Sequence, residues 1–280
     1  IRSPRIIACG RFIQAQDGHP GYTVFAADQN ILDNAMVLVN EQTDIEAEVK
    51  KLVDAGVDFI KTFISDDNKM DYPNSVPRLS NEQLKRIADT AHKYGKRLAI
   101  HVDDLKDMAD AVTIGADTIE HTINVGSTYH ELTDDLLKAL ISREVWVVPS
   151  MIATKNHDVM PNIPPVYDKL KEVIRKFIQA GVKIGVGCDS GIPFVPYGEC
   201  VHLEMELLTE VGMSPLAAIT AATGGNAKMF GQDHIFGTVE PGKAADLVIL
   251  GSNPLQDIKN TRDIKMVLRD GRIVVDNLLS

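Results

Sequence analysis

Residues 98–121, with the sequence LAIHVDDLKDMADAVTIGADTIEH, contain two short apolar runs separated by an amphipathic segment. The runs Leu98–Val102 and Thr118–His121 are predicted to be buried strands, and Leu105–Ile114 has the apolar spacing of a helix. Strands joined by such a helix are parallel, and the crossover is right-handed. This segment therefore predicts one unit of a parallel α/β fold.

The same alternation continues on both sides of this unit. Further strands are predicted at Arg5–Cys9, Phe59–Ile64, Val145–Pro149 and Ile184–Cys188, and further helices at Ile45–Ala55, Asn81–Tyr94, Asp134–Ser142, Val166–Ala180 and Glu199–Val211. The pattern fits an open doubly wound sheet or a closed (β/α) barrel. Because no Gly-rich phosphate loop opens a helix, a barrel of the TIM type is favoured.

The sequence changes character after Pro215. A helix-like run, Leu216–Thr223, is followed by β-branched segments at Thr238–Leu250 and Met266–Val275, with turn signals such as Asp270-Gly271. We expect residues 1–235 to form the barrel and residues 236–280 to form part of a small β-sandwich beside it.

Composition excludes several classes of partner. The 280 residues carry a formal net charge of -10 and no run of Lys or Arg, which argues against nucleic acid or an anionic membrane. No apolar stretch is long enough to span a bilayer. We expect a small-molecule substrate, a homo-oligomer and, as the favoured compartment, the cytoplasm. The chain starts with Ile1 inside a strand-like pattern, so we also expect N-terminal sequence to be missing, which leaves the compartment open.

Four polar residues stand at the C-terminal ends of predicted strands, namely Lys61, His101, His121 and Asp189. In a parallel barrel these ends meet at one rim, where catalytic groups converge. Two imidazoles and a carboxylate are suitable ligands for zinc or a similar divalent ion, which lowers the pKa of a bound water. Each residue alone also has a structural interpretation, such as an N-cap for Asp189. Their occurrence on four strands favours a site.

This order of residues resembles the amidohydrolase superfamily, in particular its imidazolonepropionase-like and Xaa-Pro dipeptidase (prolidase)-like members. Residues 237–248, GTVEPGKAADLV, are similar to a recurring C-terminal signature of that family, as are Ala221-Ala222-Thr223 and Asn253-Pro254-Leu255. The resemblance covers nearly the whole chain. It implies a TIM-type barrel with a small β appendage and hydrolysis of an amide (C–N) bond at a metal centre.

The resemblance also implies a role for each residue. Lys61 corresponds to the lysine that is carboxylated by carbon dioxide and bridges two metals, most simply zinc. His101 and His121 would bind the second metal, and Asp189 would bind the first and act as general acid/base. His19 resembles part of a Gly-Gly-His segment and either polarises the substrate carbonyl or has a structural role.

One family feature is missing, because the sequence contains no His-x-His pair. In the family that pair lies on the first barrel strand and binds the first metal, whereas Arg5–Cys9 resembles the third strand. We therefore expect that two barrel strands are absent from this sequence. Either sequence not shown or another chain would supply them. Without them only the second metal site would be intact, with one ion instead of two and weak or no hydrolysis.

Two other functions stay open. Asp58-Phe59-Ile60-Lys61-Thr62 resembles the Schiff-base strand of a class I aldolase, in which a lysine of lowered pKa attacks a carbonyl. A catalytically silent barrel is favoured by the missing His-x-His pair. For the hydrolase, candidate substrates are a dipeptide, an N-acyl amino acid or a cyclic amide. Basic residues in predicted rim loops could bind a substrate carboxylate; these are Lys69, Arg78 and Lys155.

Overall fold

The computed structural model describes residues 4–65, 76–124, 130–158, 165–192 and 194–277. Its main element is a parallel sheet, whose strands are β1 (Phe12–Ala15), β2 (Met36–Val39), β3 (Ile60–Ile64), β4 (Leu98–Val102), β5 (Thr118–Glu120), β6 (Trp146–Val148) and β7 (Lys183–Ile184). The strand order is β2-β1-β3-β4-β5-β6-β7. The strands thus follow the chain from β3 to β7, as in a (β/α) barrel, while β2 and β7 are the edges in the described part of the sheet.

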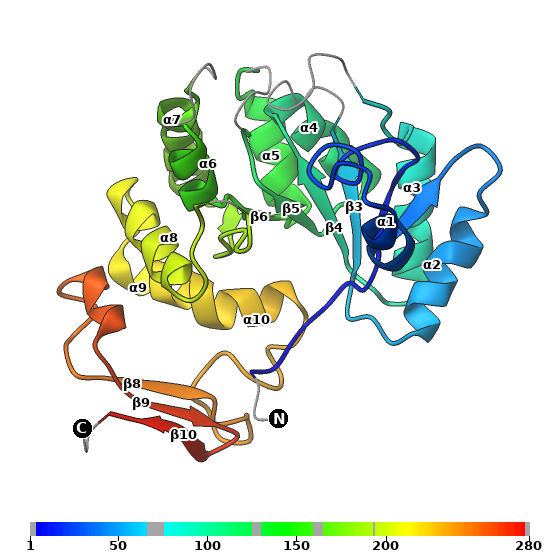
Figure 1. The fold of residues 1–280 in the computed structure, drawn as a ribbon. Coiled ribbons are helices and arrows are strands. Elements are labelled where there is room, and N and C mark those ends of the chain that lie inside the picture. Colours follow the sequence, from blue (N-terminus) through cyan, green and yellow to red (C-terminus); the bar gives the residue numbers. More distant parts are fainter. Residues whose placement is uncertain (1–3, 66–75, 125–129, 159–164, 193, 278–280) are drawn as a thin grey trace.

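Helices alternate with the strands, as Figure 1 shows. They are α1 (Gln29–Ala35), α2 (Ile45–Asp54), α3 (Asn81–Lys93), α4 (Leu105–Ile114), α5 (Asp134–Ser142), α6 (Met151–His157), α7 (Tyr167–Ala180), α8 (Glu199–Glu210), α9 (Pro215–Thr220) and α10 (Asn226–Met229), with one π-helical turn at Ala221–Gly225. Helices α2 to α5 cover one face of the sheet (Figure 1). The predicted helix Leu105–Ile114 and strand Leu98–Val102 are confirmed at both ends.

The parallel register places side chains of different strands in rows. Phe63, His101, Glu120 and Val148 are neighbours across β3 to β6, and Lys61, Ala99, Thr118 and Trp146 form the next row. Successive side chains of a strand point to opposite faces. Lys61 and Phe63 therefore share one face of β3, and residues 60, 62 and 64 share the other face, which the helices cover. Both faces are largely buried, as is usual for parallel sheets.

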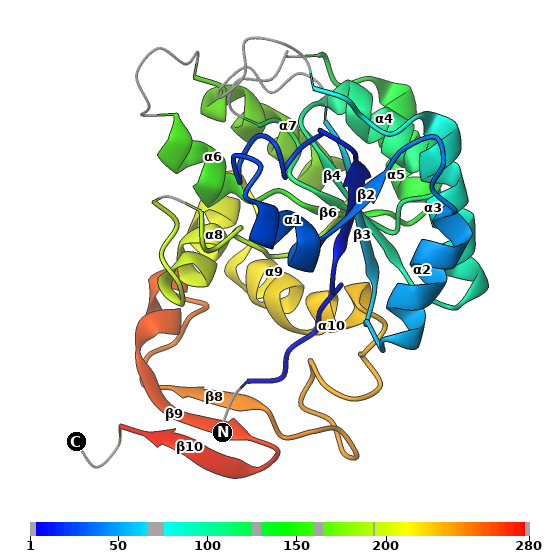
Figure 2. The same ribbon diagram turned by 45° about the vertical axis from the view of Figure 1, so that its right-hand side comes forward.

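The predicted strand Arg5–Cys9 is wrong. This segment is not paired in the sheet, and the first strand starts at Phe12. Residues 4–11 run instead from the C-terminal sheet to β1 (Figure 2), and Arg5 donates hydrogen bonds to Asp246 and Asp270. Ile6 is 72% exposed whereas Ile13 is 1% exposed, so the apolar composition alone did not identify the buried run.

Two further elements differ from the prediction. Helix α1 and strand β2 were not expected, although β2 pairs with β1 along its whole length. The predicted strand Ile184–Cys188 ends at Ile184. A Cβ atom on Gly187 would lie 2.6 Å from Cγ1 of Val148, so the chain after β7 passes too close to β6 for a side chain.

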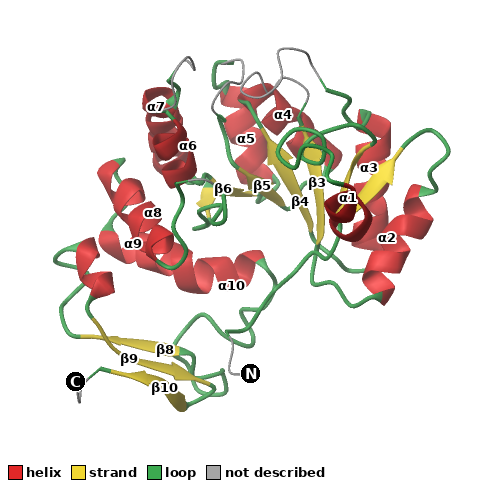
Figure 3. Ribbon diagram, viewed as in Figure 1, coloured by secondary structure: helices red, strands yellow, loops and turns green. Residues whose placement is uncertain are grey.

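A second, antiparallel sheet contains β8 (Leu247–Leu250), β9 (Ile264–Arg269) and β10 (Arg272–Asp276), in the order β10-β9-β8 (Figure 3). The predicted strand Thr238–Leu250 is shorter than expected, because residues 238–246 are irregular. A 3-10 helix, Ile258–Arg262, joins this sheet to α8, where His202 Nδ1 lies 2.8 Å from Thr261 Oγ1. The boundary between the barrel and the C-terminal sheet, predicted between residues 235 and 236, stays a prediction.

Helix α8 also supports α6 through a buried carboxylate. Glu204 is fully buried, and its two oxygens accept the backbone N–H groups of Met151 and Ile152, each at 2.8 Å. These groups are at the N-terminus of α6, where Ser150 provides no side-chain cap. Burial raises the pKa of Glu204 to about 7. Among the described residues, no helix is long and apolar enough to cross a bilayer.

Candidate active site

Three histidines and one phenylalanine meet above the ends of β1, β3, β4 and β5. The ring centroids of His101 and His121 are 4.7 Å apart, and those of His101 and His19 are 4.8 Å apart. Phe63 contacts His101 and His19 at 5.3 and 5.7 Å. The fold therefore brings together His19, His101 and His121, which the sequence places far apart.

His101 is held by a buried carboxylate that the sequence did not single out. Its Nε2 atom lies 3.1 Å from Oδ1 of Asp103. Oδ1 also accepts a hydrogen bond from Nδ2 of Asn124 at 2.9 Å, and Oδ2 accepts one from the Ser65 hydroxyl. Burial and the two other histidines lower the pKa of His101 to about 3, although Asp103 opposes this. His101 is therefore neutral at pH 7, which is the form that binds metals.

His19 lies in the loop after β1 and is buried. Its Nδ1 atom is 2.7 Å from the Thr23 hydroxyl. Burial lowers the pKa of His19; Asp103 and Asp189 oppose this shift, while His121 and Lys61 act in the same direction as burial. The ring is thus neutral at pH 7, and it contacts the His101 ring.

Lys61 does not end its strand, which corrects the prediction. It is the second residue of β3, opposite Ala99, so it lies one row below His101. Its Nζ atom is 5.3 Å from the centroid of the Phe63 ring. Burial lowers the pKa of Lys61, while the charges of Glu120, Asp189 and Cys9 act against this. A lowered pKa makes the neutral amine more available, which carboxylation and Schiff-base formation both require.

His121 and Asp189 follow the ends of β5 and β7. Both have a positive φ, 70° and 59°, a conformation that costs energy in residues other than glycine and is frequent at functional sites. His121 Nε2 is 3.9 Å from Asp189 Oδ2, which is too long for a hydrogen bond. Nδ1 of His121 is buried and has no hydrogen-bond partner among the residues that the structure describes. His121 and Asp189 therefore lie side by side without a hydrogen bond between them.

The His121–Asp189 pair fits a shared metal ion. Tetrahedral zinc binds nitrogen and oxygen ligands at about 2.0–2.2 Å, so two ligand atoms of one ion lie about 3.4 Å apart. The observed 3.9 Å between His121 Nε2 and Asp189 Oδ2 is slightly longer, and a small rotation of the half-exposed Asp189 side chain would close the difference. No group of three His, Cys, Asp or Glu side chains within the described ranges is close enough to hold an ion. The structure therefore contains a pair of suitable ligands and a neutral imidazole beside it.

Several neighbours of the site were missed by sequence reasoning. They are Ser65, Asp103, Glu120 and Asn124. Asp103 and Glu120 do have a local signal, since each is an acidic residue within two positions of a predicted ligand. Ser65 and Asn124 have none, because their contacts to Asp103 span 38 and 21 residues.

The basic residues of the rim loops do not gather at this site in the described structure. Arg78 donates to Asp107 and Asp110, both at 3.3 Å, and Lys155 lies 5.8 Å from the Tyr167 ring centroid. Lys69 is outside the described residues. A substrate carboxylate at the site would therefore have to be bound by other groups than Arg78, whose charge is already paired.

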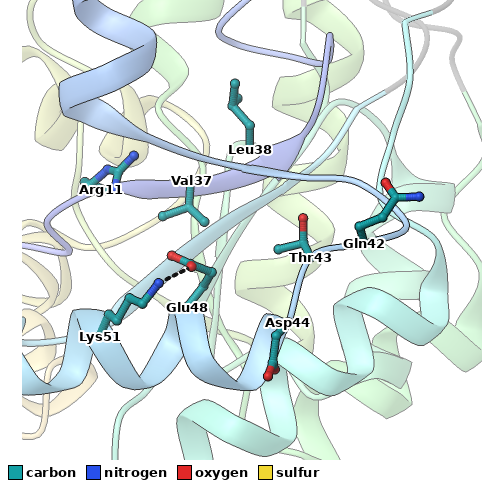
Figure 4. A pocket seen from close by; sticks show the side chains of 8 residues that line it. All are labelled: Arg11, Val37, Leu38, Gln42, Thr43, Asp44, Glu48 and Lys51. Carbon is teal, nitrogen blue, oxygen red and sulfur yellow. Dashed lines mark hydrogen bonds and ion pairs between the residues drawn. The ribbon is translucent and has the colours of Figure 1, made fainter.

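A cavity of about 510 Å³ lies elsewhere, between β2 and α2 (Figure 4). Its charged lining residues are engaged: Lys51 pairs with Glu48, and the Arg11 guanidinium donates to the carbonyl of Met36. Asp44 accepts from the backbone of α2. None of the histidines lines this cavity, which has the features of an ordinary polar surface depression.

Comparison with known proteins identifies the family of the chain. The family model described as the amidohydrolase family matches residues 3–274. Ochratoxinase from Aspergillus niger is 26% identical over 228 residues, which cover 80% of this chain and 47% of that protein. Imidazolonepropionase from Geobacillus thermodenitrificans is 24% identical over 209 residues, or 70% of this chain and 43% of that protein. The chain thus spans about half the length of these curated relatives.

Solved structures show the same fold. A Xaa-Pro dipeptidase with methionine bound in its active site has a TM-score of 0.79 and 24% identity, and the match covers 98% of this chain and 68% of that chain. The expected barrel-type α/β fold with a small C-terminal sheet is confirmed. With a family model matched along nearly its whole length, the chain belongs to the amidohydrolase family.

Proposed function

We propose that this chain carries the active site of a metal-dependent hydrolase that cleaves the amide bond of a small molecule, such as a dipeptide, an N-acyl amino acid or a cyclic amide. The observation that carries the proposal is the contact between the His101 and His121 rings, whose centroids are 4.7 Å apart, together with the 3.9 Å between His121 Nε2 and Asp189 Oδ2. Family membership supports hydrolysis, and the similar dipeptidase structure supports an amide substrate.

His101, His121 and Asp189 would hold zinc or a similar ion, with Lys61, once carboxylated, as a further ligand for one or two ions. The ion would supply a water of lowered pKa. Asp189, whose side chain is 43% exposed, would act as general acid/base, accepting a proton from water and returning it to the leaving nitrogen.

His19 would polarise the substrate carbonyl. It can do so only if Nε2 carries the proton, which requires the Thr23 hydroxyl to donate to Nδ1. The Thr23→Val substitution removes that donor, and we expect it to weaken hydrolysis while leaving the metal ligands in place.

The second candidate is a class I aldolase, favoured by the lowered pKa of Lys61. Borohydride reduction in the presence of a keto substrate would trap a covalent adduct on Lys61. This reading gives no role to His121 and Asp189, so we rank it below hydrolysis. A catalytically silent barrel would give neither an adduct nor hydrolysis.

The test is a hydrolysis assay on protein supplied with zinc and bicarbonate, using dipeptides, N-acyl amino acids and cyclic amides. We expect zinc-dependent release of the amine product by the wild-type chain and none by His121→Ala. His92→Gln, a histidine change on α3, is the matched control and should keep full activity. Absence of hydrolysis across the panel, or equal activity of His121→Ala, would contradict the proposal.

A further inference from the structure

Asp103 has the contacts of a residue that positions others. It is buried at the start of the loop after β4, two residues beyond His101. Three side chains surround its carboxylate: His101 and Asn124 at Oδ1, and Ser65 at Oδ2. A buried carboxylate is stable only if its oxygens are satisfied in this way.

Both oxygens of Asp103 are occupied, so this residue is not placed as a metal ligand. An ionised carboxylate has no proton to donate and can only accept. The hydrogen in the 3.1 Å contact with His101 therefore belongs to the imidazole Nε2. A neutral imidazole carries one proton, which leaves Nδ1 of His101 as the nitrogen with a lone pair.

We propose that Asp103 is a positioning residue that fixes His101 in the Nε2-protonated tautomer and thereby presents Nδ1 to the metal. The metal-binding part of this inference rests on the proposed function, whereas the tautomer rests on the contact between His101 Nε2 and Asp103 Oδ1. Carboxylates that accept the second N–H of a metal-binding histidine fix its ring and raise its basicity.

The same residue connects three strand ends. Ser65 directly follows β3, which carries Lys61, and Asn124 follows β5 and His121. The backbone N–H of Asn124 also donates to the carbonyl of Asp103 at 2.9 Å. Through these bonds Asp103 joins the exits of β3, β4 and β5, so its loss should disturb the alignment of their polar residues as well as the His101 ring.

The variants for a test are Asp103→Ala and Asp103→Asn, with Asp104→Asn as the control. Asn at position 103 keeps an oxygen acceptor for His101, and its amide can donate to Ser65. Asp104 is the adjacent carboxylate, but it caps α4 by accepting the N–H of Asp107 and pairs with His130 at 2.8 Å. The control therefore removes the same charge without touching His101.

Two measurements separate this inference from the proposed function. The first is the nitrogen NMR spectrum of the metal-free protein, with His101 assigned through His101→Asn. Wild type, Asp103→Asn and Asp104→Asn should show Nε2 protonated, and Asp103→Ala a mixture of tautomers. The second is zinc affinity by competition with a chromogenic chelator, which we expect Asp103→Ala to lower about 10–100-fold and Asp103→Asn much less.

The results that overturn the inference are distinct from those that overturn the function. Unchanged tautomer and zinc affinity in Asp103→Ala would refute the positioning role while leaving metal binding intact. No zinc binding by the wild-type chain would refute the metal proposal, and the NMR result would then decide the tautomer by itself. If Asp103→Ala does not fold, a protonated Nδ1 in the metal-free wild-type chain still refutes the role.

Discussion

The polar side chains on the two sides of the candidate site differ in how many of their hydrogen-bond partners the protein itself provides. On the caged side, formed by His101 and Asp103, every polar contact of the carboxylate is made within the chain, and the two side chains are 7% and 3% exposed. On the open side, formed by His121 and Asp189, the side chains are 3.9 Å apart and Asp189 is 43% exposed. Within the described part of the chain, His121 Nδ1 has no hydrogen-bond partner.

This difference separates positioning from chemistry. Groups that orient a ligand need fixed, dry hydrogen bonds, whereas groups that exchange a proton with substrate need access to it. The caged side is arranged for the first task and the open side for the second. Substitutions on the two sides should therefore have different effects on affinity, turnover and stability.

The largest expected effect is on the open side. Replacing Asp189 by Asn removes the group proposed to transfer the proton, and turnover of the best amide substrate should fall about 10²–10⁴-fold. Asp135→Asn, a change at a carboxylate that is 96% exposed, is the matched control. Steady-state kinetics at saturating zinc would measure the effect, and wild-type turnover by Asp189→Asn would remove Asp189 from the mechanism.

Glu204, on the helix that follows Asp189, should make stability depend on pH. Burial raises its pKa to about 7 from an ordinary value of 4.5, so its contribution is full below pH 4.5 and is lost as the pH rises to 7. Between about pH 5 and pH 7.5, this group should lower the free energy of unfolding by about 2 kcal/mol.

Urea unfolding of wild type and Glu204→Gln at several pH values isolates this term, because other titrations are common to both proteins. The glutamine variant should lack the decrease. Parallel stability curves for the two proteins would show that Glu204 titrates as in the unfolded chain.

Gly187 should control the backbone that leads to Asp189. A Cβ atom there would lie 2.6 Å from Val148 Cγ1, so Gly187→Ala should cost about 1–3 kcal/mol of stability. Val148→Ala removes the opposing methyl group. The double variant should consequently be less destabilised than the sum of the single variants. If urea unfolding shows that the two losses of free energy simply add, the close approach of Gly187 to Val148 does not determine the path of this segment.

The smallest effect is expected far from both sides. His92 Nε2 lies 2.8 Å from Asp117, but the His92 side chain is 42% exposed. His92→Gln should change the free energy of unfolding by less than about 1 kcal/mol and should leave zinc content unchanged. A loss of zinc in this variant would show that histidine content alone, and not the rim, determines metal binding.

The sequence predicted the central strands, most helices and the positions of His101 and His121 close to the C-terminal ends of their strands, because periodicity and strand-end position are local signals. It placed Leu98–Val102 and Leu105–Ile114 correctly but put a strand at Arg5–Cys9, where the apolar residues cover no core. Asp103 could not be recognised, since its meaning depends on Ser65 and Asn124, which only the folded sheet brings close. Lys61 was placed one row too high because strand ends are weakly marked in sequence.

The most direct test of the account is the zinc content of the purified chain, measured by plasma emission spectrometry after preparation without chelator and with bicarbonate. The account predicts one or two equivalents of zinc per chain in wild type and loss of zinc in His121→Ala. Wild-type protein without bound metal, or His121→Ala with the wild-type content, would contradict it.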